Sequence, residues 1–272
     1  MKISYLLSVV AALALPGAAY AHEFWIEPEK YQVSPQDNVI ADLRNGQLFV
    51  GTAQAFYPAR NTRLDRSLGD ETSAIEGRLG DRPAIRIPPL GDDGLLILLH
   101  EAAASSLTYK EWEKFVAFVE HKDFTTAVET HEDRGWAKED FEEVYTRHSK
   151  ALIAVGSGEG SDRAFGLATE FVALENPYAP DFDGTLDVEL LYGDAPRADA
   201  QIEVYAKDAA GEVELTVTRT DAQGRASIPV EPGLSYLLDA VVLRPVEGAT
   251  TVADGPIWET LWAALTFAVP AR

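Results

Sequence analysis

The sequence predicts a mainly β protein with two β-sandwich domains, the first of which carries a helical insertion. Short apolar or alternating runs recur through residues 22–100 and 183–270, separated by Pro, Gly, Asn and Asp clusters, as in sandwiches and barrels. Apolar residues at helical spacing gather instead between residues 107 and 155. The chain of 272 residues is 46% hydrophobic and has no cysteine, so its stability must come from apolar cores rather than disulfides.

Residues 1–21 are expected to be a cleaved signal peptide. A positively charged start precedes an apolar run from Ile3 to Ala14, and residues 19–21 form a small-x-small cleavage site. Cleavage after Ala21 would make His22 the first residue of the mature chain. No later apolar run reaches the about 18 residues that a membrane span needs. We therefore expect a periplasmic protein whose mature chain has no membrane span.

The first domain is expected to cover residues 22–180. Its strands are predicted at Phe24–Ile26, Asn38–Leu43, Gln47–Val50, Ser73–Leu79, Ala84–Ile87 and Leu95–His100. The mixed charges of residues 60–70 indicate a long connection, and residues 165–174 are expected to return to the same sheet.

The helical insertion is expected at about residues 107–155. Thr108 and Glu111 have the spacing of a capping box, which predicts the start of a helix. The apolar stripe behind it consists of Trp112, Phe115, Val116 and Val119. A second helix is expected to begin near Asp123. A third is expected from Lys138, with a buried face formed by Phe141, Val144, Tyr145, His148, Leu152 and Val155.

The second domain is expected to cover residues 181–272, after a Pro-rich linker at residues 176–180. Well-marked turns separate six predicted strands, which are Thr185–Tyr192, Ala200–Lys207, Glu212–Thr218, Ala226–Val230, Ser235–Leu243 and Trp258–Val269. The five tryptophans of the chain are expected to pack in the cores rather than to form a sugar-binding platform.

The charge of the chain limits its partners. Asp and Glu number 44 against 23 Lys and Arg, giving a formal net charge of −21. Such a chain repels nucleic acid and anionic lipid, and its field attracts cations. With no cysteine, and with its single methionine at position 1, any metal site must use histidine, carboxylate or a free amine. No G-x-S-x-G motif indicates a serine hydrolase.

His22 is the leading candidate for a metal ligand. A histidine at a free amino terminus can chelate one ion through its α-amine, whose pKa is near 8, and its imidazole. No pair of histidines has H-x-x-x-H spacing, so further ligands must come from separate segments. We expect His22 to be joined by His131 or His100, although both fit an alternative role as packed or half-exposed histidines. Copper, nickel or zinc would suit such a nitrogen-rich site.

Two resemblances extend these expectations. Residues 191–200, 220–225 and 232–237 resemble a transthyretin-like or peptidase-regulatory immunoglobulin-type module. Residues 21–28, 107–115, 150–156 and 170–178 resemble a family of exported bacterial proteins of uncharacterised function, often labelled as nickel- or cobalt-uptake-associated periplasmic components. The second resemblance implies a metal-ion cargo and a metal-uptake transporter or outer-membrane receptor as partner.

Three functions are compatible with these patterns. The leading interpretation is periplasmic binding or delivery of nickel, cobalt or copper without turnover. An N-terminal histidine brace holding copper could instead run oxidative chemistry on polysaccharides. The third possibility is a structural or adhesive two-sandwich protein in which the histidines have no metal-binding role.

Overall fold

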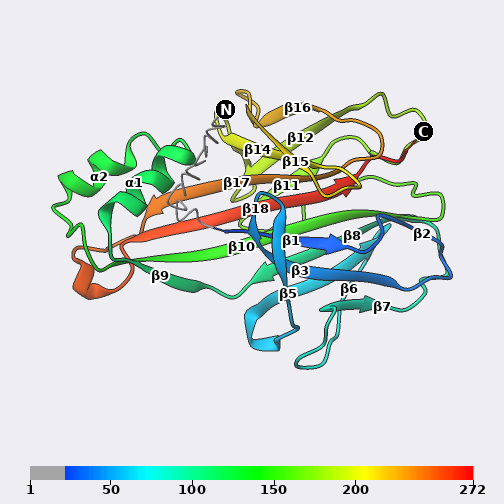
Figure 1. Cartoon of the computed structure of the whole chain (residues 1–272), viewed down its shortest axis with the longest axis horizontal. Helices are drawn as coiled ribbons and strands as arrows, with labels where there is room; N and C mark the ends of the chain where they lie inside the picture. The colour runs from blue at the N-terminus through cyan, green and yellow to red at the C-terminus, as the bar shows by residue number, and fades with distance from the viewer. Residues whose placement is uncertain (1–21, 272) are drawn as a thin grey trace, which may run out of the picture.

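The computed structural model describes residues 22–271, and the expected signal peptide lies outside them (Figure 1). Within this range the chain forms three β-sheets and two α-helices, so the fold is mainly β, as predicted. None of the helices in this range is long and apolar enough to cross a membrane.

The largest sheet contains ten strands. They are β2 Gln32–Val33, β5 Asn61–Leu68, β6 Glu71–Ala74, β8 Gly94–Ala102, β9 Ser105–Tyr109, β10 Phe141–Val155, β14 Gln201–Lys207, β15 Val213–Arg219, β17 Ser235–Pro245 and β18 Trp258–Ala268. The order across the sheet is β15-β14-β17-β18-β10-β8-β5-β6, and β2 and β9 also pair with β10. This sheet runs along the long axis of the molecule (Figure 1).

Two four-stranded sheets accompany the large one. The first consists of β1 Glu23–Pro28, β3 Val39–Gln47, β4 Val50–Gln54 and β7 Ile85–Ile87. The second consists of β11 Thr169–Ala173, β12 Thr185–Tyr192, β13 Ala195–Pro196 and β16 Arg225–Pro229. Single 3-10 turns occur at Pro58–Arg60 and Val252–Asp254.

The large sheet is buried on both faces, with one small sheet against each. Successive side chains of a strand point to opposite faces. In β8, Leu95, Ile97 and Leu99 therefore belong to one core cluster, together with residues of β11, β12 and β16. Leu96 and Leu98 belong to a second cluster, with residues of β1, β3 and β7. The architecture is thus a three-layered arrangement of sheets around the ten-stranded one.

The large sheet crosses the boundary expected at residue 180. β10 from the first half and β18 from the second pair in parallel, from Glu143↔Trp258 to Ala151↔Thr266. The cluster that contains Leu95 also contains Leu265 and Phe267. The two halves therefore share a sheet and a core, with no break in either at the linker.

The predicted third helix is wrong, because residues 141–155 form the long strand β10. Its last residues alternate between the two cores, with Leu152 and Ala154 in one and Ala151, Ile153 and Val155 in the other. A strand that is buried on both faces shows no polar alternation, so its apolar run resembles the buried face of a helix.

Two further expectations about the first half are also wrong. Thr108 lies in β9, and the helix begins only at Trp112, after an N-cap at Glu111 that makes no side-chain hydrogen bond. The four residues with capping-box spacing therefore cover the end of a strand and the turn before the helix. Residues 61–68 form β5 rather than a connection. Its alternation is obscured by charged side chains such as Arg63 and Asp65, which pair with each other at 2.6 Å.

The two helices, α1 Trp112–His121 and α2 Ala127–Asp133, lie together at one end of the large sheet (Figure 1). They pack on β10, β17 and β18 through an aromatic cluster. Trp25, Trp136, Trp258 and Trp262 are all at most 6% exposed, which confirms their predicted place in the cores.

Candidate functional site

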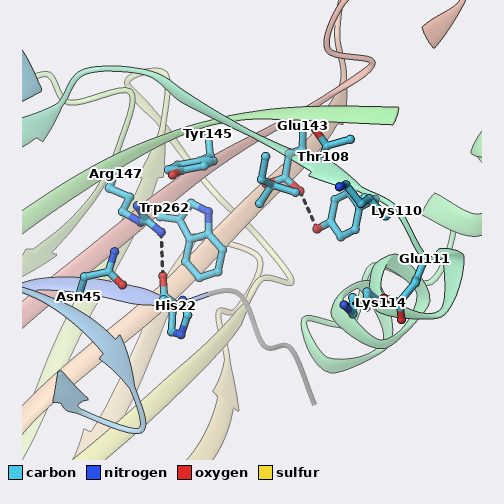
Figure 2. A pocket seen from close by; sticks show the side chains of 12 residues that line it. His22, Asn45, Thr108, Lys110, Glu111, Lys114, Glu143, Tyr145, Arg147 and Trp262 are labelled. Atoms are coloured by element: carbon cyan, nitrogen blue, oxygen red, sulfur yellow. Dashed lines mark hydrogen bonds and ion pairs between the residues drawn. The ribbon is translucent and has the colours of Figure 1, made fainter. Parts of the chain in front are cut away.

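His22, the first residue that the structure describes, lies at a cavity of about 370 Å³ between the start of β1, the β9–α1 segment and strands β10 and β18 (Figure 2). The lining residues are His22, Asn45, Leu107, Thr108, Tyr109, Lys110, Glu111, Lys114, Glu143, Tyr145, Arg147 and Trp262. Arg147 and Asn45 lie on one side of His22, and Lys110 and Lys114 lie on the other.

Arg147 fixes the backbone of His22. Its Nη2 donates a hydrogen bond of 3.1 Å to the carbonyl oxygen of His22, and its guanidinium lies 4.4 Å from the ring centroid of Tyr145. The next residue, Glu23, already pairs with β3. The imidazole of His22 is exposed and takes part in no hydrogen bond or ion pair within residues 22–271. The residue is therefore held by its backbone while its ring nitrogens stay available.

The cavity holds an excess of cationic side chains. Lys114 pairs with Glu111, Nζ to Oε1 at 2.9 Å. Lys110 and Arg147 form no ion pair with a carboxylate among the described residues, although Arg147 interacts electrostatically with Glu143 and Asp239. Glu143 is only 1% exposed and accepts hydrogen bonds from Tyr109 at 2.9 Å and Thr260 at 2.5 Å.

Burial raises the pKa of Glu143 to about 7, although both of these hydrogen bonds oppose the rise. Near neutral pH this carboxyl therefore compensates the cations only in part.

A buried charge cluster lies next to this cavity. Lys122, at the end of α1, places its Nζ 2.8 Å from Glu203 and 2.9 Å from Asp239. Tyr205 donates hydrogen bonds to Glu203 and, at 3.2 Å, to Glu23. Burial and the negative charge of Asp239 raise the pKa of Glu23 to about 8. The ammonium group of Lys122 thus joins the end of α1 to the large sheet through two buried carboxylates.

Sequence reasoning missed this cluster and the cations of the cavity. One signal for the cluster was available in the sequence. Asp239 stands within the apolar run from Leu237 to Val241, and a charged residue in a buried strand usually has a charged partner. Arg147 carried no such signal, because its segment was read as a helix.

His100 lies in a separate place from His22. It lines a second cavity of about 270 Å³, which shares Asn45, Tyr145 and Arg147 with the first. Its Nε2 donates to Oδ1 of Asn61 at 2.8 Å. Burial, together with the neighbouring His148, lowers the pKa of His100 to about 3, so the ring is neutral.

His131 is enclosed by aromatic rings, and both of its nitrogens have partners. Nε2 donates to the carbonyl oxygen of Ala137 at 3.0 Å, and Nδ1 accepts from Nε1 of Trp258 at 3.1 Å. His131 is 0% exposed and has no free lone pair, which is the geometry of a histidine packed in a core.

His148 is buried as well, and its Nδ1 donates to the carbonyl oxygen of Trp262 at 3.1 Å. In the part of the chain that the structure describes, no three His, Asp or Glu side chains gather as a metal-binding group. The fold therefore does not bring His22, His100 and His131 together.

A family match covers residues 19–244 and carries the description "Domain of unknown function (DUF4198)". The chain belongs to the DUF4198 family. Comparison with curated proteins finds no match.

Among solved structures, the DUF4198 chain is similar to a tetra-tandem repeat in the extending region of a large adhesion protein, with 11% identity and a TM-score of 0.21. That match covers 91% of this chain and 49% of the other, so the chain spans about half of that structure. It is also similar to the D0-D1 domain of intimin, with 10% identity, a TM-score of 0.21 and coverage of 89% and 97% of the two chains. The family description names no activity.

Proposed function

We propose that the exported, processed protein binds a divalent transition-metal ion, such as nickel, cobalt or copper, through the α-amine and imidazole of His22. The observation that carries this proposal is the state of His22. Its backbone is anchored by Arg147, whereas its ring is exposed and uncommitted at the mouth of a cavity. A chelating residue that is already held in place loses less conformational entropy when the ion binds.

The donors around His22 favour a two-nitrogen chelate. Both oxygens of Glu143 accept hydrogen bonds, and Glu111 is paired with Lys114. His22 is the only histidine among the described residues that line the cavity. An ion at His22 would therefore keep several coordination positions open. Borderline ions such as Ni(II) and Cu(II) accept amine and imidazole nitrogens readily.

This donor set supports binding and delivery over oxidative catalysis. A copper brace needs a third nitrogen, from a second histidine, and His22 is the only histidine among the described residues that line its cavity. His100, whose Nδ1 has no hydrogen-bond partner among the described residues, lines the adjoining cavity instead. Open positions instead suit an ion that is to be passed on, because a partner's ligands can enter before those of His22 leave. An ion that is passed on needs a receiving partner, such as a metal-uptake transporter or receptor. The resemblance to nickel- and cobalt-uptake-associated components supports the same kind of partner.

The test is a competitive metal titration of two preparations that both begin at His22, one with a free α-amine and one with the α-amine acetylated. Acetylation removes the amine donor and changes no side chain. We expect the acetylated protein to bind Ni(II) at least about tenfold more weakly, since the imidazole loses the amine as its chelate partner. A His22→Ala preparation, which keeps an amine without the imidazole, should lose affinity as well. Equal binding by all three, or binding by none, would overturn the proposal.

A further inference from the structure

We propose that the metal occupies this site as an anionic complex with a small polycarboxylate rather than as the hydrated ion, so that the cavity binds the metal and its carboxylate chelator together. The inference rests on the proposed role of His22. It follows from the charge, the size and the walls of the cavity.

The cationic side chains of the cavity contrast with the charge of the whole chain. The protein carries a formal net charge of −21, yet Lys110 and Arg147 line the cavity without an ion pair to a carboxylate in the described range, and Arg147 interacts with Glu143 and Asp239 only through longer-range electrostatics. The remaining cation, Lys114, is already paired with Glu111. A bare divalent ion at His22 would be repelled by the first two groups, because like charges in a partly desolvated site interact strongly.

A carboxylate chelator resolves this conflict. Carboxylates on the metal fill the coordination positions that the nitrogens of His22 leave open, and their outer oxygens can accept hydrogen bonds from cations. Arg147 presents a planar guanidinium, which suits carboxylate recognition, and it uses one of its donors on the His22 carbonyl. Arg147 lies against the backbone of His22, and Lys110 lies farther along the same cavity, so a complex bound at His22 that extends into the cavity would meet both cations (Figure 2).

The cavity also has the size and composition of a small-molecule site. Its volume of about 370 Å³ falls within the roughly 300–1,000 Å³ typical of such sites. Trp262, Tyr145 and Leu107 supply apolar walls. Helix α1 begins here without a side-chain cap, so its first turn adds the partial positive charge of a helix N-terminus. None of these features is needed to hold a single hydrated ion.

The experiment measures the ternary complex directly, using the protein that begins at His22. Equilibrium dialysis would compare hydrated Ni(II) in a non-coordinating buffer, the 1:1 Ni(II)–citrate complex made with radiolabelled citrate, and labelled citrate alone. We expect citrate to be retained together with nickel, and Ni(II)–citrate to bind about tenfold more tightly than hydrated Ni(II). Citrate without nickel should be retained much more weakly than the complex.

A matched pair of variants then tests the cations. Lys110→Gln should weaken Ni(II)–citrate binding several-fold while leaving the affinity for hydrated Ni(II) equal or higher. Lys138→Gln is the control, because Lys138 pairs with Glu132 and does not line the cavity. If nickel binds but citrate only strips it from the protein, or if both variants behave alike, this inference is overturned and the proposed function stands. If hydrated nickel itself does not bind at His22, the proposed function fails first.

Discussion

Lys122 connects the end of α1 to the large sheet, and replacing it by methionine tests how strongly this buried charge holds the fold together. Nζ lies 2.8 Å from Glu203 and 2.9 Å from Asp239, and the ammonium group also lies 4.9 Å from the ring centroid of Trp262. Burial lowers the pKa of Lys122, but the charges of Asp239 and Glu203 outweigh that effect and raise it above its usual value. Lys122→Met keeps a chain of similar length and removes only the charge.

The expected loss can be worked out from this geometry. All three side chains are at most 6% exposed, and removing one partner of a buried ion pair typically costs about 3–5 kcal/mol. The methionine would recover part of that cost through contact with Trp262. We therefore expect the free energy of unfolding to fall by about 3–4 kcal/mol at pH 7, a large part of a typical total of about 5–15 kcal/mol.

The loss should depend on pH in a defined direction. Burial raises the pKa of Asp239 above its ordinary value, and the charge of Lys122 opposes that rise, so the pKa of Asp239 should rise further without Lys122. The same loss removes one of the groups that hold the pKa of Glu203 at about 2. A carboxyl with a raised pKa favours folding when it is protonated, so its unfavourable contribution grows as the pH rises above its unfolded value of about 4. The destabilisation by Lys122→Met should accordingly be smaller at pH 5 than at pH 8.

Urea denaturation followed by tryptophan fluorescence would measure these free energies. Lys114→Met is the matched control, because Lys114 lies on the same helix but is 47% exposed and pairs only with Glu111. A surface pair of this kind contributes at most about 1 kcal/mol. A loss below about 1 kcal/mol for Lys122→Met, or a loss that does not change between pH 5 and pH 8, would refute the reasoning.

Three further predictions follow from particular contacts. Burial raises the pKa of Glu143 to about 7 from its ordinary 4.5, so this carboxyl favours folding below pH 4.5 and that contribution declines as the pH rises to about 7. The decline should amount to about 3 kcal/mol in the unmodified protein. The unfolding free energy of Glu143→Gln, measured across the same pH range, should not show it. His131→Leu leaves Nε1 of Trp258 and a backbone carbonyl without partners and should cost about 2–4 kcal/mol, with no change in Ni(II) affinity. Gly51→Ala places a Cβ 2.6 Å from Trp25 and should cost about 1–3 kcal/mol in the same assay.

Each of these has a clear contrary outcome. If the unfolding free energy of Glu143→Gln declined with pH in parallel with that of the unmodified protein, Glu143 would not be the cause of the decline. Weaker Ni(II) binding by a folded His131→Leu variant would restore His131 as a ligand candidate. A Gly51→Ala protein of unchanged stability would show that the β3–β4 hairpin can move away from Trp25.

In the second half of the chain, local sequence patterns predict the strand boundaries to within a few residues. The run 185–192 is predicted and observed as a strand, and Gln201–Lys207 and Trp258–Ala268 lie within one residue of the predicted ends. Turn residues and short apolar runs are local features, so no knowledge of the partners was needed. The strand that follows His22 was likewise predicted from local residues, at Phe24–Ile26, and β1 covers Glu23–Pro28.

Only the tertiary structure shows which distant segments pair in the large sheet. Residues 141–155 became β10 because β18, more than a hundred residues later, pairs with them, and burial of both faces removed the alternation that marks a strand. Arg147, on β10, hydrogen-bonds the carbonyl oxygen of His22 from 125 residues away. His131 hydrogen-bonds Trp258, on β18, and the nearby carbonyl of Ala137. Which groups meet at the cavity depends on contacts between distant segments, and a local pattern does not record them.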